Sequence, residues 1–166
     1  MKRLVKILIV AALGLMSSNV FAQSTCREYH KQKCQSYASK GYIMSNDSRS
    51  CIMRKGQTSE FRITIYQGKD YRISVCADEA NLGGTVHMRL IDYDTEELLY
   101  DNKDFNFVKD FEFTVVQTRT IKISIEIPED QSQKASANTT GLISKSINQG
   151  CVGVLIEEMS TPKTGF

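Results

Sequence analysis

The chain has 166 residues, of which 21 are Lys or Arg and 19 are Asp or Glu, with five cysteines and no tryptophan. This near balance of charge excludes the strongly basic proteins that bind nucleic acid or anionic membranes through a cationic surface. The length is typical of one ordinary domain that buries its own core.

The first 22 residues have the organisation of a cleavable signal peptide. Lys2, Arg3 and Lys6 form a positive start, residues 7–16 are apolar, and Ala22 supplies the small residue at the cleavage point. The apolar run is too short for a membrane-spanning helix, which needs roughly 20 residues. We therefore expect no membrane span after signal cleavage, and a mature protein located in the periplasm or secreted. Without the leader, 18 basic residues face 19 acidic ones.

The cysteines all follow the predicted cleavage point. Export places them in an oxidising compartment, where disulfides are the default. Their odd number leaves at least one thiol free or paired with another molecule. No Cys-x-x-Cys motif is present and the chain has only two histidines, so the pattern does not favour a zinc or iron site. The five are Cys26, Cys34, Cys51, Cys76 and Cys151.

Residues 25–39 are predicted to form an N-terminal helix. Thr25 is placed to cap its start, and Glu28, three residues later, completes a capping-box pattern. Several of the less polar residues recur at helical spacing. Gly41 then marks the end of the helix.

In the rest of the chain apolar residues alternate with polar ones, which indicates half-buried strands. The clearest run is Ile121, Ile123, Ile125 and Ile127. A series of such strands separated by turn signals favours antiparallel sheets. We predict a mainly β fold, an antiparallel, jelly-roll-like β-sandwich with one N-terminal helix, in a single domain of residues 23–166. The other expected strands are 61–65, 71–75, 86–90, 97–100, 111–115 and 152–156.

Residues 129–149 break this pattern, because they are polar and poor in aromatic side chains. A stretch of this length without secondary structure is long for a compact domain. We predict a mobile loop there, which is either a binding loop or a tolerated insertion.

Strand parity predicts how the cysteines pair. Cys76 and Cys151 each lie on the face opposite the apolar residues of their own strand, so they can bridge if the two strands are neighbours. We predict this disulfide and a second between Cys34 and Cys51, which would tie the helix to the first strand. Cys26 would lie about 12 Å from Cys34 along one helix. It is therefore expected to be left over, as an exposed redox handle or a buried inert thiol.

The densest group of oxygen ligands surrounds a predicted hairpin and contains Asp92, Asp94, Glu96 and Asp101. Calcium prefers carboxylate and carbonyl oxygens supplied from loops. The spacing lacks the glycine and the distal glutamate of a helix-loop-helix calcium site. We therefore expect no cofactor, and we keep calcium as an alternative to ordinary solvated turns.

No catalytic residues are predicted, because no nucleophile elbow, phosphate loop or zinc-protease motif is present. His30 is expected in the helix and His87 in a strand, neither beside a recognisable nucleophile. Surface tyrosines on a sandwich can stack on sugars or a partner protein, but the absence of tryptophan weakens the case for sugars, and ordinary packing is the favoured interpretation. The tyrosines expected near strand ends are Tyr66, Tyr71, Tyr93 and Tyr100.

Two resemblances add to these patterns. The strand segments resemble those of pre-peptidase C-terminal-like jelly-roll domains, which implies a non-catalytic sandwich, in some cases calcium-binding. Residues 26–158 also look like small uncharacterised exported β-sandwich proteins of Bacteroidetes-type bacteria, which implies no activity. The segments concerned are residues 61–75, 90–92, 98–102, 150–152 and 155–156.

Three functions remain open. The leading hypothesis is a non-enzymatic protein of the cell envelope that binds a protein or glycan partner through its surface or loops. A small periplasmic hydrolase with an unrecognised carboxylate site is the second. A secreted inhibitor or accessory subunit is the third, and it predicts a stoichiometric protein complex.

Overall fold

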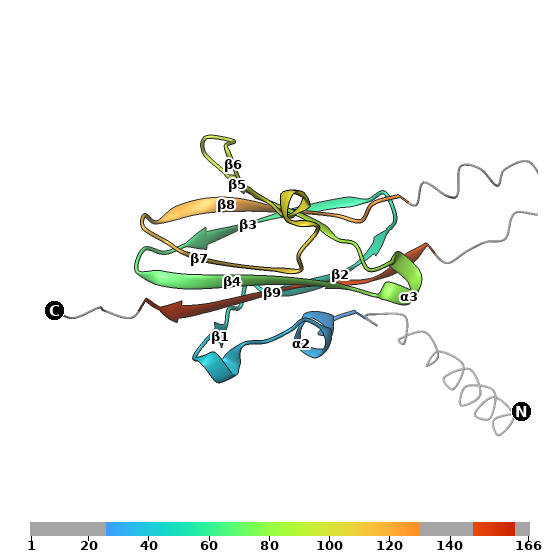
Figure 1. Ribbon diagram of the computed structural model, residues 1–166, viewed down its shortest axis with the longest axis horizontal. Helices are drawn as coiled ribbons and strands as arrows, with labels where there is room; N and C mark the ends of the chain where they lie inside the picture. Colours follow the sequence, from blue (N-terminus) through green and yellow to red (C-terminus); the bar gives the residue numbers. More distant parts are fainter. Residues whose placement is uncertain (1–25, 130–147, 162–166) are drawn as a thin grey trace, which may run out of the picture.

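A computed structural model describes residues 26–129 and 148–161 as two antiparallel sheets that face each other (Figure 1). The predicted antiparallel β-sandwich is therefore confirmed. In sheet A the strand order is β1–β9–β4–β7, and β2 also pairs with β9. In sheet B the order is β3–β8–β5–β6. Sheet A contains β1 (Ile43–Met44), β2 (Arg49–Arg54), β4 (Lys69–Ala77), β7 (Asp110–Thr114) and β9 (Gln149–Ser160). Sheet B contains β3 (Thr58–Ile65), β5 (His87–Asp92), β6 (Leu98–Asp101) and β8 (Arg119–Glu126).

The core lies between the two sheets and follows the alternation seen in the sequence. On β8, Ile121 and Ile123 are fully buried, and Ile73 on β4 faces them from the opposite sheet. Each such side chain contributes about 1.5–3 kcal/mol by leaving water. The inward faces of β3, β4, β5, β8 and β9 are therefore the apolar stripes that the sequence predicts.

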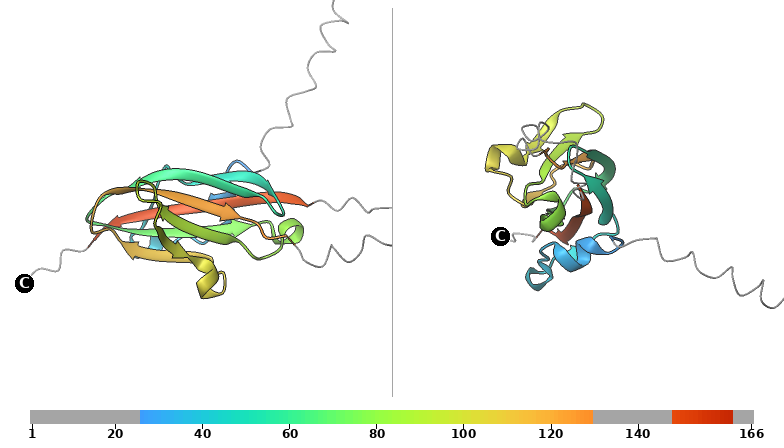
Figure 2. Two further views of the ribbon diagram at one scale, coloured as in Figure 1. Left: turned by 90° about the horizontal axis from the view of Figure 1, so that it is seen from above. Right: turned by 90° about the vertical axis from the view of Figure 1, so that its right-hand side faces the viewer.

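The N-terminal segment, residues 26–42, covers the outer face of sheet A. It lies below β4 and β9 in Figure 1 and also in the end-on view of Figure 2. Its helices are short: α2 spans Tyr29–Lys33, and a 3₁₀ turn spans Ala38–Lys40. The predicted helix over residues 25–39 is thus wrong in extent. The backbone becomes extended at Cys34, with ψ of 148°, because the side chain of Cys34 forms a disulfide with Cys76 on β4. Glu28 makes no capping bond and instead pairs with Lys31, 3.0 Å away.

Two further short helices complete the described part of the chain. The helix α3 (Glu79–Leu82) follows β4, and the 3₁₀ turn η2 (Asn102–Phe105) follows β6. The side chain of Asn102, which is fully buried, accepts a bond from the Met88 N–H and donates to the Val86 and Val108 carbonyls. This network fixes η2 beside β5.

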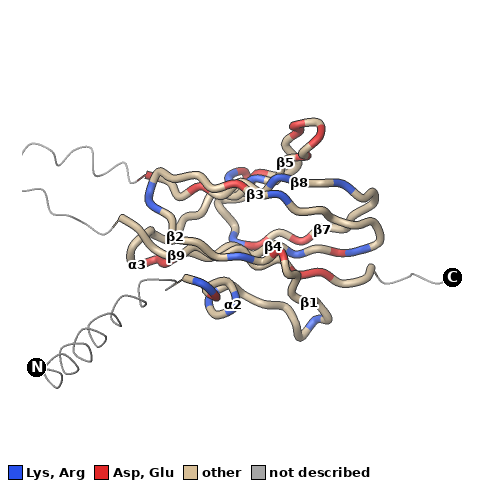
Figure 3. The backbone as a smooth tube through the Cα atoms, turned by 180° about the vertical axis from the view of Figure 1, so that it is seen from behind, with Lys and Arg blue, Asp and Glu red and all other residues tan. Residues whose placement is uncertain are grey.

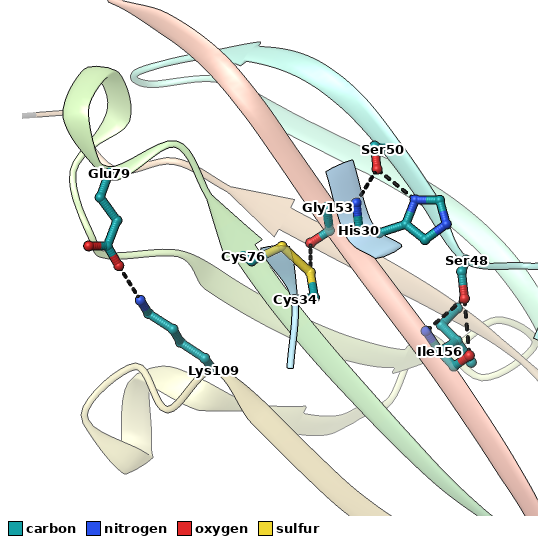
Figure 4. Close-up of a disulfide and its surroundings, with 9 residues drawn as sticks. All are labelled: His30, Cys34, Ser48, Ser50, Cys76, Glu79, Lys109, Gly153 and Ile156. Carbon is teal, nitrogen blue, oxygen red and sulfur yellow. Dashed lines mark hydrogen bonds and ion pairs between the residues drawn. A yellow bond between two sulfur atoms is a disulfide. The ribbon is translucent and has the colours of Figure 1, made fainter. Parts of the chain in front are cut away.

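Polar contacts and disulfides hold the N-terminal segment to sheet A. Glu157 on β9 is 1% exposed, and its carboxylate accepts bonds from the Ser36 hydroxyl at 2.6 Å and the Tyr37 N–H at 3.1 Å. The guanidinium of Arg72 lies 3.2 Å from the centre of the Tyr37 ring. Strands β1 and β2 both pair with β9, and Ser48 lies between them. The Ser48 hydroxyl donates to the Ile156 carbonyl and accepts from the Ile156 N–H, in place of a backbone pair (Figure 4).

The disulfides join Cys26 to Cys151 and Cys34 to Cys76. The predicted Cys76–Cys151 pairing is wrong because of strand register. On β9, Gly153 is the residue opposite Cys76, so Cys151 lies two residues further along. Both strand cysteines do point away from the core, as parity predicted, but they meet the N-terminal segment rather than each other.

Cys51 is the free thiol among the five cysteines, and the predicted Cys34–Cys51 disulfide is also wrong. Cys51 shares its face of β2 with buried Met53 and lies beside Ser59 and Phe61 of β3, at the gap between the sheets. The N-terminal segment covers the opposite face of the strand. Cys34 and Cys51 therefore lie on opposite sides of sheet A and cannot form the predicted disulfide.

Two predictions fall on residues that the structure does not describe. The signal peptide of residues 1–22 lies outside the described residues, as does nearly all of the loop predicted at 129–149, of which Glu129, Asn148 and Gln149 are described. Within the described ranges, no helix is long and apolar enough to cross a membrane.

Candidate protein-binding surface

The edge strands of the two sheets, β6 and β7, lie next to each other on one side of the sandwich. The rings of Tyr100 on β6 and Phe111 on β7 stack with their centres 3.8 Å apart. Phe105 stacks on Tyr100 at 5.5 Å, and Phe113 stacks on Phe111 at 5.2 Å. These four rings form a continuous aromatic row across the gap between the sheets. Burial raises the pKa of Tyr100, so its hydroxyl stays neutral at physiological pH.

A cleft of about 200 Å³ opens beside this row. Phe111 and Phe113 line it together with Leu99 from β6 and Val116, which follows β7. Val116 is 78% exposed and Phe105 is 59% exposed, while Leu98 and Leu99 also reach the solvent. We call this surface the β6–β7 side, defined by Leu98, Leu99, Phe105, Phe111, Phe113 and Val116. Apolar groups gathered at one place on a surface are typical of sites that bind other molecules.

The sequence carries a signal for this surface that strand alternation alone misses. Val115 and Val116 are adjacent apolar residues, as are Leu98 and Leu99. Successive side chains of a strand point to opposite faces, so at least one member of each pair has to leave the core. Val115 is buried and Val116 is exposed.

The outer face of β7 is acidic. Asp110 and Glu112 point away from the core, and the guanidinium of Arg72 on β4 lies 2.8 Å from the first carboxylate and 3.6 Å from the second. The Tyr42 hydroxyl donates to Glu112 at 2.6 Å. Burial is the main cause that raises the pKa of Tyr42, and the bond to Glu112 adds to it, so the hydroxyl remains a donor.

A second, larger cavity of about 600 Å³ lies beside the Cys34–Cys76 disulfide, and Figure 4 shows that disulfide. Its walls come from the N-terminal segment, the end of β4 and α3, and they carry both signs of charge. Glu79 and Lys109 close on each other there at 2.6 Å. The lysine is the main cause that lowers the pKa of the glutamate. This cavity is wide and polar, and the charges of Glu79 and Lys109 are already paired with each other rather than free to bind a ligand.

His87, which was expected in a strand, is the first residue of β5 and lies between two carboxylates on the outer face of sheet B. Its Nε2 is 2.8 Å from Asp101, and its Nδ1 is 3.3 Å from Glu126. Partial burial acts to raise the pKa of Asp101, but the Lys103 N–H and His87 outweigh it and hold that pKa below its ordinary value. Both ring nitrogens are thus occupied, and neither is left to activate a nucleophile.

The calcium candidates are not brought together. Asp92 and Asp101 lie at opposite ends of the β5–β6 pair, since Asp101 is opposite Arg89 in the register. The Asp92 carboxylate accepts bonds from the Asp94 and Thr95 N–H groups. The bond from the Thr95 N–H is the main cause that lowers the pKa of Asp92, and the bond from Asp94 adds to it.

The remaining calcium candidates also have other roles. Asp94 lies in the β5–β6 turn, where Glu96 lies 3.4 Å from Lys122. Within the described ranges, no group of three or more His, Cys, Asp or Glu side chains is arranged to hold a metal ion. The acidic tip of this hairpin is visible in Figure 3.

The tyrosines do not form the platform that was one hypothesis for sugar binding. Tyr71 and Tyr100 are buried, whereas Tyr66 and Tyr93 are exposed. Tyr66 follows β3 and Tyr93 follows β5, so the exposed pair belongs to separate strand ends. Burial also raises the pKa of Tyr71 to about 12.

Comparison with known proteins adds little to these surfaces. No protein-family model matches the chain, and no curated protein matches it either. Among solved structures, the fold is similar to that of Aeromonas hydrophila PliG, described as a periplasmic lysozyme inhibitor of g-type lysozyme. The identity is 7%, the TM-score is 0.46, and the match covers 72% of this chain and 90% of that chain. Because the likeness is so low, function has to be argued from this chain's own surfaces.

Proposed function

We propose that this chain is an exported, non-enzymatic protein that binds another protein through the β6–β7 side. The observation that carries the proposal is the exposed apolar cleft next to the aromatic row, at the place where both sheets end. Aromatic anchors in a desolvated pocket dominate the affinity of protein interfaces. Two disulfides within one small domain are typical of an exported protein.

A protein fits this surface better than a glycan does. The cleft is lined mainly by aliphatic and aromatic side chains, with Thr114, Gln117 and Arg119 as its polar members. Sugars need several convergent hydrogen-bonding groups as well as a ring to stack on, because each hydroxyl lost from water has to be satisfied. An apolar side chain from a partner protein needs neither.

The test is photo-crosslinking in intact cells of the native host. The photoreactive amino acid p-benzoylphenylalanine replaces Val116 on the β6–β7 side or, as the matched control, Ile52, which is 54% exposed on β2. We expect one discrete crosslinked partner from position 116, no such product from position 52, and loss of the product when Leu99→Lys is added. Equal products from both positions, or none from either, would contradict the proposal.

If the captured partner is itself an enzyme, the chain is an inhibitor or an accessory subunit, the more specific form of the same proposal. The purified partner is then assayed with and without one equivalent of this protein. A fall in turnover identifies an inhibitor, and a rise identifies an accessory subunit. The Leu99→Lys variant is expected to have neither effect, because it places a charge in the apolar cleft.

A further inference from the structure

The strand β7 has a free edge. Among the described strands it pairs with β4 alone. The Val75 N–H donates to the Lys109 carbonyl, and the Val115 N–H donates to the Lys69 carbonyl. Backbone groups of an antiparallel strand alternate between its two neighbours. The N–H and C=O groups of Asp110, Glu112 and Thr114 therefore point away from β4, where another strand can bond to them.

A strand added at this edge would extend sheet A over the cleft of the β6–β7 side. Its alternate side chains would point inward, level with Phe111 and Phe113, because neighbouring strands share the pleat of the sheet. The cleft is apolar at that place and holds about 200 Å³. That volume suits one or two aliphatic side chains. Inward positions of the added strand are therefore apolar.

The outward positions of the added strand would face acidic groups. Asp110 and Glu112 share the single guanidinium of Arg72, and Asp70 lies opposite Thr114, whose hydroxyl donates to it, so carboxylates outnumber cations on this face. The lysines near the two ends of β7 are already paired: Lys109 precedes the strand, and Lys69, the first residue of β4, bonds to Val115 just after it. Lys69 lies 2.6 Å from Glu158, and Lys109 lies 2.6 Å from Glu79. Lysine or arginine on the added strand complements this face.

The same charges disfavour a second copy of this chain as the occupant. In the antiparallel arrangement that overlaps two β7 strands fully, Glu112 would lie opposite its own copy. Like charges directly opposite each other on neighbouring strands are destabilising. The acidic edge therefore protects the chain against self-pairing, a known hazard of exposed edge strands.

We propose that β7 binds an extended segment of a partner protein as an added strand of sheet A, with apolar and basic side chains alternating along that segment. This inference rests on the proposed function and specifies its binding mode. Main-chain hydrogen bonds supply affinity in such strand addition, and the side-chain pockets supply specificity.

The probe is a synthetic peptide of alternating lysine and valine, seven residues long, blocked at both ends and labelled for fluorescence anisotropy. Its controls are a peptide of the same composition with the lysines and valines in two blocks, and a peptide with glutamate in place of lysine. We expect the alternating basic peptide to bind the mature protein at least tenfold more tightly than either control. Equal binding of the two basic peptides would mean charge attraction alone and would overturn the inference.

Two variants separate strand addition from other binding. Thr114→Pro removes a backbone donor that points away from β4, so the native ladder is kept while the free edge is blocked. Glu112→Lys reverses one charge, and Glu60→Lys on β3, the edge strand of sheet B, is its matched control. We expect roughly a tenfold loss of peptide affinity from each of the first two variants and an unchanged affinity from the third.

The outcomes distinguish the two proposals. If position 116 still crosslinks its partner in cells when Thr114→Pro is present, the binding function holds and strand addition is wrong. If no partner crosslinks at all, the proposed function itself fails. Circular dichroism and an unchanged melting transition show that each variant is folded. A variant that is not folded is replaced by an N-methylated peptide, which lacks the N–H groups that would donate to the free carbonyls of β7 and so weakens the same added ladder from the peptide side.

Discussion

At the scale of single residues, the thiol of Cys51 shows how burial governs reactivity. Its side chain lies at the gap between β2 and β3, and burial raises its pKa above the ordinary value. The thiolate is the reactive form of cysteine. The thiol is therefore reachable but slow to react at neutral pH.

We predict that iodoacetamide labels one cysteine of the native mature protein, Cys51, and that the rate keeps rising with pH beyond about 8.5, the usual thiol pKa. Peptide mass spectrometry without reduction measures both the site and the rate. The Cys51→Ser variant should take no label. Label on Cys26, Cys34, Cys76 or Cys151 in the native protein would contradict the observed pairing.

At the scale of secondary-structure elements, α2 lies directly on β9 because Gly153 has no side chain. A Cβ atom at this position would lie 2.7 Å from the Cα of His30 and 2.9 Å from the Sγ of Cys76. Neither neighbour can move easily, since one is backbone and the other belongs to a disulfide. The close contact of the N-terminal segment with sheet A therefore depends on this glycine.

We expect Gly153→Ala to lower the free energy of unfolding by about 1–3 kcal/mol, the usual cost of overpacking, as measured by urea denaturation. Gly84→Ala is the control, because a Cβ there would lie 3.8 Å from its nearest neighbour, an ordinary contact. It should change stability by no more than about 1 kcal/mol. Equal losses from the two variants would show that α2 does not rest tightly on β9.

At the scale of the whole molecule, residues of both charge signs are mixed along the chain (Figure 3), and buried titratable groups add a pH dependence of their own. His30 is the clearest of these. It is buried against β2, with its Nδ1 2.7 Å from the Ser50 hydroxyl. Burial is the main cause that lowers its pKa, followed by Lys31, while Glu28 acts in the opposite direction.

We predict that the protein loses stability as the pH falls below about 6.5, the pKa of an unfolded histidine. Between that value and the lower pKa of folded His30 the unfolded chain binds more protons, so acid favours unfolding. Above pH 6.5 the contribution is fully present. Urea denaturation at pH 7 and pH 5 measures the loss, which His30→Asn should reduce. An unchanged loss in the His30 variant would refute the assignment.

The fold class and the core were determined by the sequence itself, because a period of two in hydrophobicity directly reports which face of a strand is buried. The isoleucines of β8 predicted a half-buried strand, and the parity of Cys76 and Cys151 correctly placed both on the face opposite the core. Local patterns of this kind need no knowledge of which strand is next to which.

Only the tertiary structure decided the disulfide pairing and the binding surface, because both depend on register and on edges. A shift of two residues between β4 and β9 places Cys76 beside Gly153 rather than Cys151, and no periodicity in the sequence reports such a shift. The predicted long helix failed for the same reason, since the disulfide of Cys34 and the bonds of Ser36 and Tyr37 to Glu157 on sheet A outweigh local helical preference. The β6–β7 side exists because β6 and β7 both end their sheets on one side of the sandwich, which is a property of strand order and not of any single segment.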